Sequence, residues 1–240
     1  MPTDQPEPST RYAVYFVPAA ESALYRFGSS VLGYDCYTGN DLPPREEFAS
    51  DAALWRELSA EPRRYGFHAT LKAPFRLAPS RTEAELIGAF ASLASLDPAI
   101  GRISPEVSLI SGFVAIVPRQ RCAAVAALAD RCTTALDAFR APMSARERGR
   151  RVAGGLSERQ MRYLERWGYP YVLEDFRFHM TLTGRLAGER ASAVLAQLRS
   201  SFAAACGEQE LAIDRLALLR QEGEQAPFRV LCQAALSGGG

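Results

Sequence analysis

The spacing of apolar and polar positions predicts a chain that mixes helices and strands. Aromatic and β-branched residues fill 11–17 (RYAVYFV), which ends at Pro18 and predicts a strand. Apolar positions recur at helical intervals over 20–32, and Gly33 follows as a C-terminal glycine, so this segment predicts a helix. The same reasoning predicts helices over 81–96, 119–139, 157–167 and 188–205, a short helix within 46–58, strands over 67–77, 171–183, 210–219 and 228–235, and a hairpin over 107–117.

The order of these elements repeats along the chain. In each half, a strand is followed by a helix and then by two further strands. This repetition predicts an α+β protein with a bilobal duplicated fold, in which two mainly antiparallel sheets with outer helices surround a central cleft. We expect a single domain over residues 11–236, between a disordered tail at 1–10 and a short tail at 237–240.

The only two histidines of the chain, His68 and His179, have matching neighbours. Each follows a Phe and precedes Thr and Leu by two and three positions, in FHATL and FHMTL. Because alternate residues of a strand share a face, each histidine shares one with its threonine, Thr70 or Thr181, while the apolar neighbours form the other face. A single histidine of this kind is more often structural than catalytic, but the repeated pattern favours a functional pair.

Imidazole chemistry gives such a pair a function. The pKa of imidazole lies near neutrality, so one histidine can accept a proton while another donates one. Two histidines facing each other across a cleft suit in-line displacement at phosphorus, with the hydroxyls of Thr70 and Thr181 donating hydrogen bonds to the non-bridging oxygens. A cyclic phosphodiester suits this arrangement especially well, because its ring strain lowers the barrier to opening.

A metal centre is the competing chemical interpretation, and the spacing of the acidic residues disfavours it. Glu174 and Asp175 fall on opposite faces of the predicted strand before His179, and the acid nearest His68 is Glu61, beyond a Pro-Arg-Arg turn. We expect no metal and no cofactor. The five scattered cysteines contain no C-x-x-C pair, which argues against a zinc site or a disulfide framework and fits a reducing cytoplasm.

Three further polar residues extend the histidine faces. Lys72 follows Thr70 and could add a positive charge to a phosphate site, whereas Thr183 stands at the matching position of the second copy. Arg177 precedes His179 on its face and could clamp a phosphate, with a surface salt bridge as the equal alternative.

Two tyrosines and a basic segment complete the candidates. Tyr15 lies on the first strand and could pack against a sugar or base, although core packing is favoured. Tyr171 lies before the second histidine strand and could bind substrate or only position that strand. The basic loop 144–155 (SARERGRRVAGG) is more typical of a solvated surface, with a grip on a second phosphate as the alternative.

Bulk charge and hydrophobicity exclude other classes of protein. A net charge of +1 gives no overall field to attract nucleic acid or an anionic membrane. The N-terminal MPTDQPEPST has neither the basic start nor the apolar run of a signal peptide, and no apolar stretch approaches the ~18 residues of a membrane span. We expect a cytoplasmic monomer without membrane contact.

The two tetrads, HATL at 68–71 and HMTL at 179–182, resemble the paired H-x-[ST]-x motifs of the 2H (two-histidine) phosphoesterase superfamily. The surrounding strings RRYGFHATLKAPFRL and RWGYPYVLEDFRFHMTLTGRL resemble its branch of bacterial proteins associated with phosphonate-metabolism operons, over residues 11–235. This resemblance implies a bilobal fold with both tetrads lining a central cleft and metal-independent attack on cyclic or 2′-linked phosphodiesters. For this branch it implies a ribose 1,2-cyclic phosphate of phosphonate degradation as the substrate.

These observations together predict an enzyme, a phosphodiesterase that opens a small cyclic phosphate by two-histidine acid–base catalysis. One alternative is a 2′,3′-cyclic phosphodiesterase acting on RNA ends, which the near-neutral charge disfavours because RNA binding relies on many cationic contacts to phosphates. The other is a non-catalytic protein that binds a phosphate ligand on the same scaffold.

Overall fold

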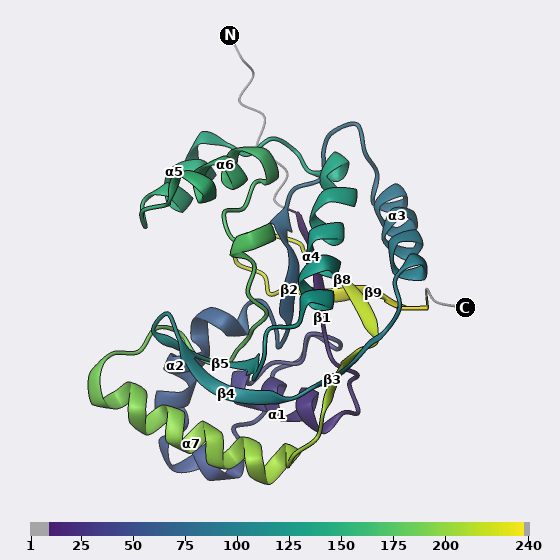
Figure 1. The fold of residues 1–240 in the computed structure, drawn as a ribbon. Helices are drawn as coiled ribbons and strands as arrows, with labels where there is room; N and C mark the ends of the chain where they lie inside the picture. The colour runs from purple at the N-terminus through teal and green to yellow at the C-terminus, as the bar shows by residue number, and fades with distance from the viewer. Residues whose placement is uncertain (1–9, 238–240) are drawn as a thin grey trace.

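A computed structural model describes residues 10–237 of the chain (Figure 1). The tails predicted at 1–10 and 237–240 lie outside the described residues except for Thr10 and Ser237. The elements in chain order are β1 (Arg11–Phe16), α1 (Ala23–Leu32), η1 (Glu46–Asp51), α2 (Ala52–Arg63), β2 (Ala69–Phe75), α3 (Glu83–Leu96), β3 (Ile100–Ile103), β4 (Pro105–Ile110), β5 (Phe113–Pro118), α4 (Ala123–Ala135), η2 (Asp137–Phe139), α5 (Ala145–Val152), α6 (Glu158–Trp167), η3 (Leu173–Asp175), β6 (Met180–Thr181), α7 (Gly188–Cys206), β7 (Leu211–Ile213), β8 (Arg215–Gln221) and β9 (Arg229–Ala235).

The strands form two antiparallel sheets, so the predicted α+β class is confirmed. One sheet has seven strands in the order β4-β5-β6-β2-β1-β8-β9, and the other pairs β3 with β7. The two histidine strands are neighbours within the larger sheet, although the repeated element order predicts a separate sheet for each half. Strand β1 of the first half pairs with β2 on one side and with β8 of the second half on the other, so this strand group draws on both halves of the sequence.

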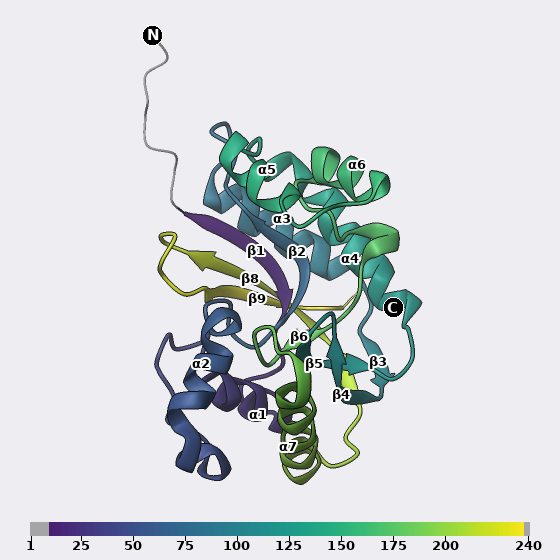
Figure 2. The same cartoon turned by 90° about the vertical axis from the view of Figure 1, so that its left-hand side faces the viewer.

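The larger sheet consists of two strand groups that meet between β2 and β6 through a single residue pair, Ala69 with Met180. Helices α3 and α4 pack on the group β2-β1-β8-β9, and α7 packs on β4 and β5 and against α1 (Figures 1 and 2). Each group thus has its own helical layer. The tetrads lie where the two groups meet.

Two segments differ from the predictions because local polar contacts override the average pattern. The basic segment predicted as a loop contains helix α5, since Ser144 and Glu147 form a reciprocal capping box at its start. The predicted strand 171–183 pairs only at Met180–Thr181. Before it, Asp175 accepts hydrogen bonds of 3.0 and 2.7 Å from Arg159, which hold a short 3₁₀ turn in place of an extended strand.

The apolar sides of both histidine strands anchor them in the core, as the alternation predicts. Phe67, Ala69 and Leu71 are buried in the first copy, and Phe178, Met180 and Leu182 are buried in the second. Burying a large apolar side chain contributes roughly 1.5–3 kcal/mol of free energy relative to leaving it exposed. This anchorage fixes the polar sides of the strands relative to one another.

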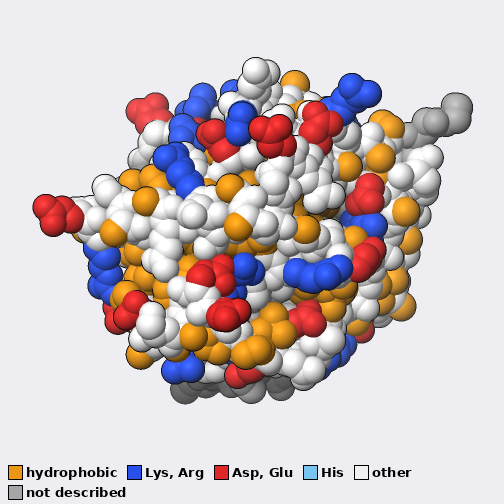
Figure 3. Space-filling view, turned by 90° about the horizontal axis from the view of Figure 1, so that it is seen from below, with side chains coloured by type: hydrophobic (Ala, Val, Ile, Leu, Met, Phe, Trp, Pro, Cys, Tyr) orange, Lys and Arg blue, Asp and Glu red, His pale blue; other side chains and the backbone are white. Residues whose placement is uncertain are grey.

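The lower surface of the molecule, where α1, α2 and α7 lie, carries acidic and basic side chains interspersed with apolar ones (Figure 3). A mixed surface of this kind is consistent with the small net charge. Within residues 10–237, the helices are too short or too polar to cross a bilayer.

Gly28 lets helix α1 approach the residue that precedes the first histidine. A Cβ atom built at Gly28 would overlap the ring of Phe67, which has no exposed surface. Gly88 in α3 is the contrasting case, because a Cβ there meets nothing within 4 Å.

We expect Gly28→Ala to destabilise the protein by about 1–3 kcal/mol, because overpacking against Phe67 outweighs the gain in helix propensity. Gly88→Ala is the matched control and should stabilise by roughly 0.5–1 kcal/mol. Urea unfolding monitored by circular dichroism measures both changes. Equal effects of the two substitutions would contradict the close approach of α1 to Phe67.

Candidate active site

The pairing of β2 with β6 sets the two tetrads against each other symmetrically. Ala69 lies opposite Met180, so extending this antiparallel register by one residue sets His68 opposite Thr181. In the other direction it sets Thr70 opposite His179. Directly opposed residues of neighbouring strands have Cβ atoms roughly 4.5–5.5 Å apart. The Ala69–Met180 pair therefore brings the two tetrads to the same junction of the sheet.

Both imidazoles are held in the same way by backbone carbonyls. Nδ1 of His68 donates to the carbonyl oxygen of Gly66 (2.9 Å), and Nδ1 of His179 donates to that of Arg177 (2.7 Å), two residues upstream in each case. Because a carbonyl oxygen only accepts, Nδ1 must carry the hydrogen, and Nε2 of each neutral ring remains an acceptor. Nε2 of His68 accepts from the hydroxyl of Thr70 (3.1 Å).

The carbonyl that holds His68 comes from a backbone position that requires glycine. Gly66 has φ +74°, and a Cβ there would lie 2.6 Å from Cβ of Cys36. Both the left-handed conformation and the close packing exclude a larger residue without movement of the chain. The YGFH string therefore contains a turn that aims the His68 ring.

An aromatic ring supports each imidazole. Tyr15 has no exposed surface and stacks on His68, with ring centroids 3.7 Å apart and an interplanar angle of 22°. Phe113 lies beside His179 with centroids 5.6 Å apart. Tyr15 is therefore buried, as core packing predicts. Its ring also lines the cavity beside His68. Its hydroxyl has no hydrogen-bond partner among the described residues.

Burial keeps both imidazoles neutral near pH 7. Desolvation lowers the pKa of His68 to about 4; the Gly66 hydrogen bond opposes this shift, and the nearby His179 adds to it. Desolvation also lowers the pKa of His179, against the hydrogen bond to Arg177. Two neutral rings with unprotonated Nε2 atoms can take up protons once a bound anion stabilises the imidazolium form.

Both tetrads line one cleft, as the resemblance to the 2H superfamily implies. A cavity of about 440 Å³ is lined by His68, Thr70, His179 and Thr181 together. A second cavity of about 410 Å³ adjoins it, because Thr70, His179 and Phe113 line both.

Lys72 lies outside this cleft, and its predicted contact with the phosphate site is wrong. Its ammonium group is buried, donates to the carbonyl of Thr133 (2.9 Å) and lies 3.7 Å from a carboxylate oxygen of Asp137. The cause is an irregularity in the pairing of β1 with β2, where Tyr15 and Val14 oppose Thr70 and Lys72, so that one extra residue bulges from β2. This bulge turns Lys72 towards helix α4 and Ala73 towards the cleft.

The other predicted binding residues all line the cavities, but they differ in exposure and in how far their polar groups are already hydrogen-bonded. Arg177 is exposed and lines the 410 Å³ cavity with His179. Tyr171, 47% exposed, lines both cavities and meets Tyr169 edge to face. Thr183 is fully buried, and its hydroxyl already accepts from the backbone of Val114 and donates to Gly184.

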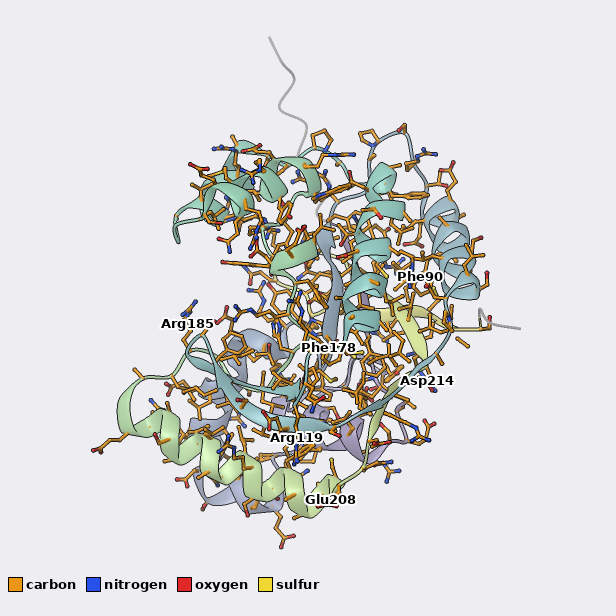
Figure 4. The ribbon with its side chains drawn as sticks, viewed as in Figure 1. Phe90, Arg119, Phe178, Arg185, Glu208 and Asp214 are labelled. Atoms are coloured by element: carbon orange, nitrogen blue, oxygen red, sulfur yellow. The ribbon has the colours of Figure 1, made fainter. Side chains whose placement is uncertain are left out.

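The structure adds cleft residues that the sequence patterns did not single out. Arg11, Tyr65 and Arg185 line the cavity that contains both histidines. Tyr65 and Arg185 lie within the repeated strings YGFHATL and HMTLTGR, so their nearness to the tetrads is the signal that could have identified them. Figure 4 shows Arg185 at the open side of the molecule and Phe178 turned into its interior.

Acidic residues do not gather at this site. Within residues 10–237, the arrangement of His, Cys, Asp and Glu side chains includes no group of three or more that could hold a metal ion. The donors presented to the cleft are hydroxyls and guanidinium groups, which suit an anionic ligand, and Glu61 also lines the cavity.

We expect NMR titration to show both imidazoles titrating below the ordinary value of 6.5, with His68 near pH 4. Since the chain has only two histidines, every imidazole resonance in the spectrum comes from one of these two rings. Inorganic phosphate should raise both pKa values. The unfolded chain binds these protons more readily than the native one, so native stability should fall as the pH drops from about 6.5 to 4. Titration of both rings at 6.5 or above would contradict the desolvated site.

Two curated bacterial relatives, both called ribose 1,5-bisphosphate phosphokinase PhnN, are similar to this chain over nearly its whole length. The protein from Janthinobacterium sp. (strain Marseille) is 37% identical over 237 residues, which cover 98% of this chain and 52% of the relative. The protein from Laribacter hongkongensis (strain HLHK9) is 35% identical over 224 residues, which cover 93% and 51%. The chain thus spans about half the length of these relatives.

Among solved structures, E. coli LigT complexed with 3′-AMP is 15% identical, with 95% of this chain and 98% of that chain covered and a TM-score of 0.42. A family model described as "Protein of unknown function (DUF1045)" matches residues 70–229, which is more than half of the chain. The chain therefore belongs to this DUF1045 family.

Proposed function

We propose that this protein is a phosphodiesterase that opens a small cyclic phosphate by acid–base catalysis between His68 and His179. The observation that carries the proposal is the matched pair of imidazoles in one cleft, each locked through Nδ1 to the carbonyl two residues upstream. Because Nδ1 of each ring is engaged by a backbone carbonyl, the two Nε2 atoms are the sites that can gain and lose protons. In-line displacement at phosphorus needs one such site on each side of the reacting atom.

The reaction balances with water as the nucleophile. One imidazole accepts a proton from water as its oxygen bonds to phosphorus, and the ring P–O bond breaks on the opposite side. The other imidazole, protonated, donates its proton to the leaving oxygen, which gives a phosphomonoester and a free hydroxyl. Since both pKa values are lowered in the free protein, the anionic substrate itself would promote protonation of the acid.

The threonines would stabilise the transition state. Thr70 and Thr181 line the same cavity as the histidines. Hydroxyls in these positions can donate to the non-bridging oxygens, where negative charge gathers. Thr181 makes no hydrogen bond through its hydroxyl to another described residue, so this donor is available to a ligand.

A ribose 1,2-cyclic phosphate is the substrate that we propose. Opening this ring at the 2-oxygen leaves a phosphate on C1, and a ribose that also carries a 5-phosphate would then become ribose 1,5-bisphosphate. That compound appears in the names of both curated relatives, which supports a phosphorylated ribose as the substrate.

The kinase activity in those names has no evident basis in this chain. A Walker-type phosphate loop, G-x-x-x-x-G-K-[ST], needs a lysine after glycine, whereas the only lysine here follows Leu71 and is buried against Thr133. Because the chain spans about half of each relative, we propose that this half carries the phosphoesterase activity.

His68→Ala and His179→Ala should each lower kcat/KM for a ribose 1,2-cyclic phosphate by roughly 10²–10⁴-fold, because each removes one proton-transfer partner. The assay is run with a chelator present, and near-ultraviolet circular dichroism verifies the fold of both variants. Undiminished turnover by either variant would refute its role. Tight binding of cyclic phosphates by the wild type without turnover would instead indicate a binding protein.

Thr181→Val should lower kcat by about 10–100-fold with a smaller change in KM, because the lost hydrogen bond strengthens mainly in the transition state. Thr134→Val is the matched control, since Thr134 lies on α4 and its hydroxyl bonds to the carbonyl of Asp130. Its turnover should equal that of the wild type. A similar loss in both variants would argue against a specific role for Thr181.

A further inference from the structure

An arginine-rich hollow of about 670 Å³ adjoins the histidine cleft. We name it the arginine hollow; its cationic lining consists of Arg11, Arg64, Arg76, Arg146, Arg150 and Arg151. Among residues 10–237, the carboxylates that line it are those of Glu147 and Glu224. Concentrated positive charge of this kind in a concave surface favours an anion.

Most of this charge has no anionic partner within residues 10–237. Arg76 forms an ion pair with Glu147 (3.1 Å), whereas two other arginines donate to neutral oxygens. Arg11 donates to the side-chain amide of Gln221 (2.7 Å), and Arg64 donates to the backbone carbonyl of Glu224. Their full charges thus remain available to a ligand.

Helix α5 supplies three of the six arginines, and burial of apolar side chains does not explain why this helix lies beside the hollow. It buries none of its residues. Arg146 and Arg150 lie one turn apart, so both face the hollow, where their mutual repulsion opposes helix formation. Neither makes a hydrogen bond or ion pair with another described residue. Arg148 lies on the other side of the same helix, where it pairs with Glu165 (2.7 Å).

The hollow and the catalytic cleft are continuous. Arg11, Tyr65 and Arg151 line both the hollow and the cavity that contains the two histidines. Arg151 also lies over the ring of Tyr169, another residue of that cavity, with 5.2 Å between guanidinium and ring centre. A single small ligand can therefore reach from the histidine pair to the guanidinium groups.

We propose that the arginine hollow binds a second phosphate group of the substrate, so that the enzyme acts on cyclic phosphates that carry a further terminal phosphate. This inference rests on the proposed function and specifies its substrate class. Guanidinium groups bind phosphate through paired, charge-assisted hydrogen bonds, and several around one hollow match the charge of a phosphomonoester dianion. The small net charge of +1 and this local concentration of arginine favour a small bisphosphate over an extended polynucleotide.

The test compares ribose 1,2-cyclic phosphate with and without a 5-phosphate. The wild type should show a kcat/KM about tenfold or more higher for the 5-phosphorylated compound, since charged hydrogen bonds of this kind contribute a factor of this order. A double variant, Arg146→Gln with Arg150→Gln, should reduce that preference by about tenfold. Arg148→Gln, on the same helix but outside the hollow, should keep the wild-type preference.

Several outcomes would overturn the proposal. Equal use of the two compounds by the wild type would do so, as would an unchanged preference in the double variant. A higher kcat/KM for an oligonucleotide ending in a 2′,3′-cyclic phosphate, lost in the double variant, would reassign the hollow to a polynucleotide backbone.

A binding measurement separates this proposal from the proposed function. Calorimetry with ribose 5-phosphate should give an affinity about tenfold weaker in the double variant than in the wild type. If neither cyclic phosphate is opened but this difference is found, the phosphodiesterase function fails while the phosphate site stands. If cyclic phosphates are opened but the affinities are equal, the function stands and the phosphate site fails.

Discussion

The site depends on one interaction made twice: a hydrogen bond from Nδ1 of a histidine to the carbonyl oxygen two residues before it. This bond fixes the rotation and the tautomer of each ring, so both Nε2 atoms remain unprotonated acceptors, and that of His68 accepts from the hydroxyl of Thr70. It also partly offsets the cost of burying each imidazole. Without it, desolvation would still hold the rings neutral, but the tautomer that leaves Nε2 unprotonated would no longer be fixed.

The rest of the fold positions the two histidine strands so that both hydrogen bonds form at one site. The pair of Ala69 with Met180 is the only register contact between β2 and β6, and it joins the second residue of one tetrad to the second residue of the other. Apolar neighbours on the buried sides of both strands then hold the pair in the core. The larger sheet thus joins two strand groups at the point where the polar sides of their histidine strands must meet.

Most of the histidine site could be predicted from the sequence, because strand alternation is a short-range rule. It separates His68 and Thr70 from the apolar Phe67 and Ala69 correctly, and it does the same in the second copy. The rule fails at Lys72, because a bulge depends on the partner strand and has no clear signature within β2. Strand alternation could not predict that both tetrads lie in one sheet either, since this depends on pairing between residues more than a hundred positions apart.

The bulge in β2 also determines how the charge near the cleft responds to alkali. In the position to which the bulge turns it, burial lowers the pKa of the Lys72 ammonium to about 8, so this group loses its charge under mildly basic conditions away from the cleft. By turning the chain's only lysine into the protein, the bulge leaves guanidinium groups as the permanent cations along the cleft and hollow within residues 10–237. Guanidinium stays protonated at any pH at which the protein is folded. Electrostatic attraction of a phosphate ester should therefore persist well above neutrality.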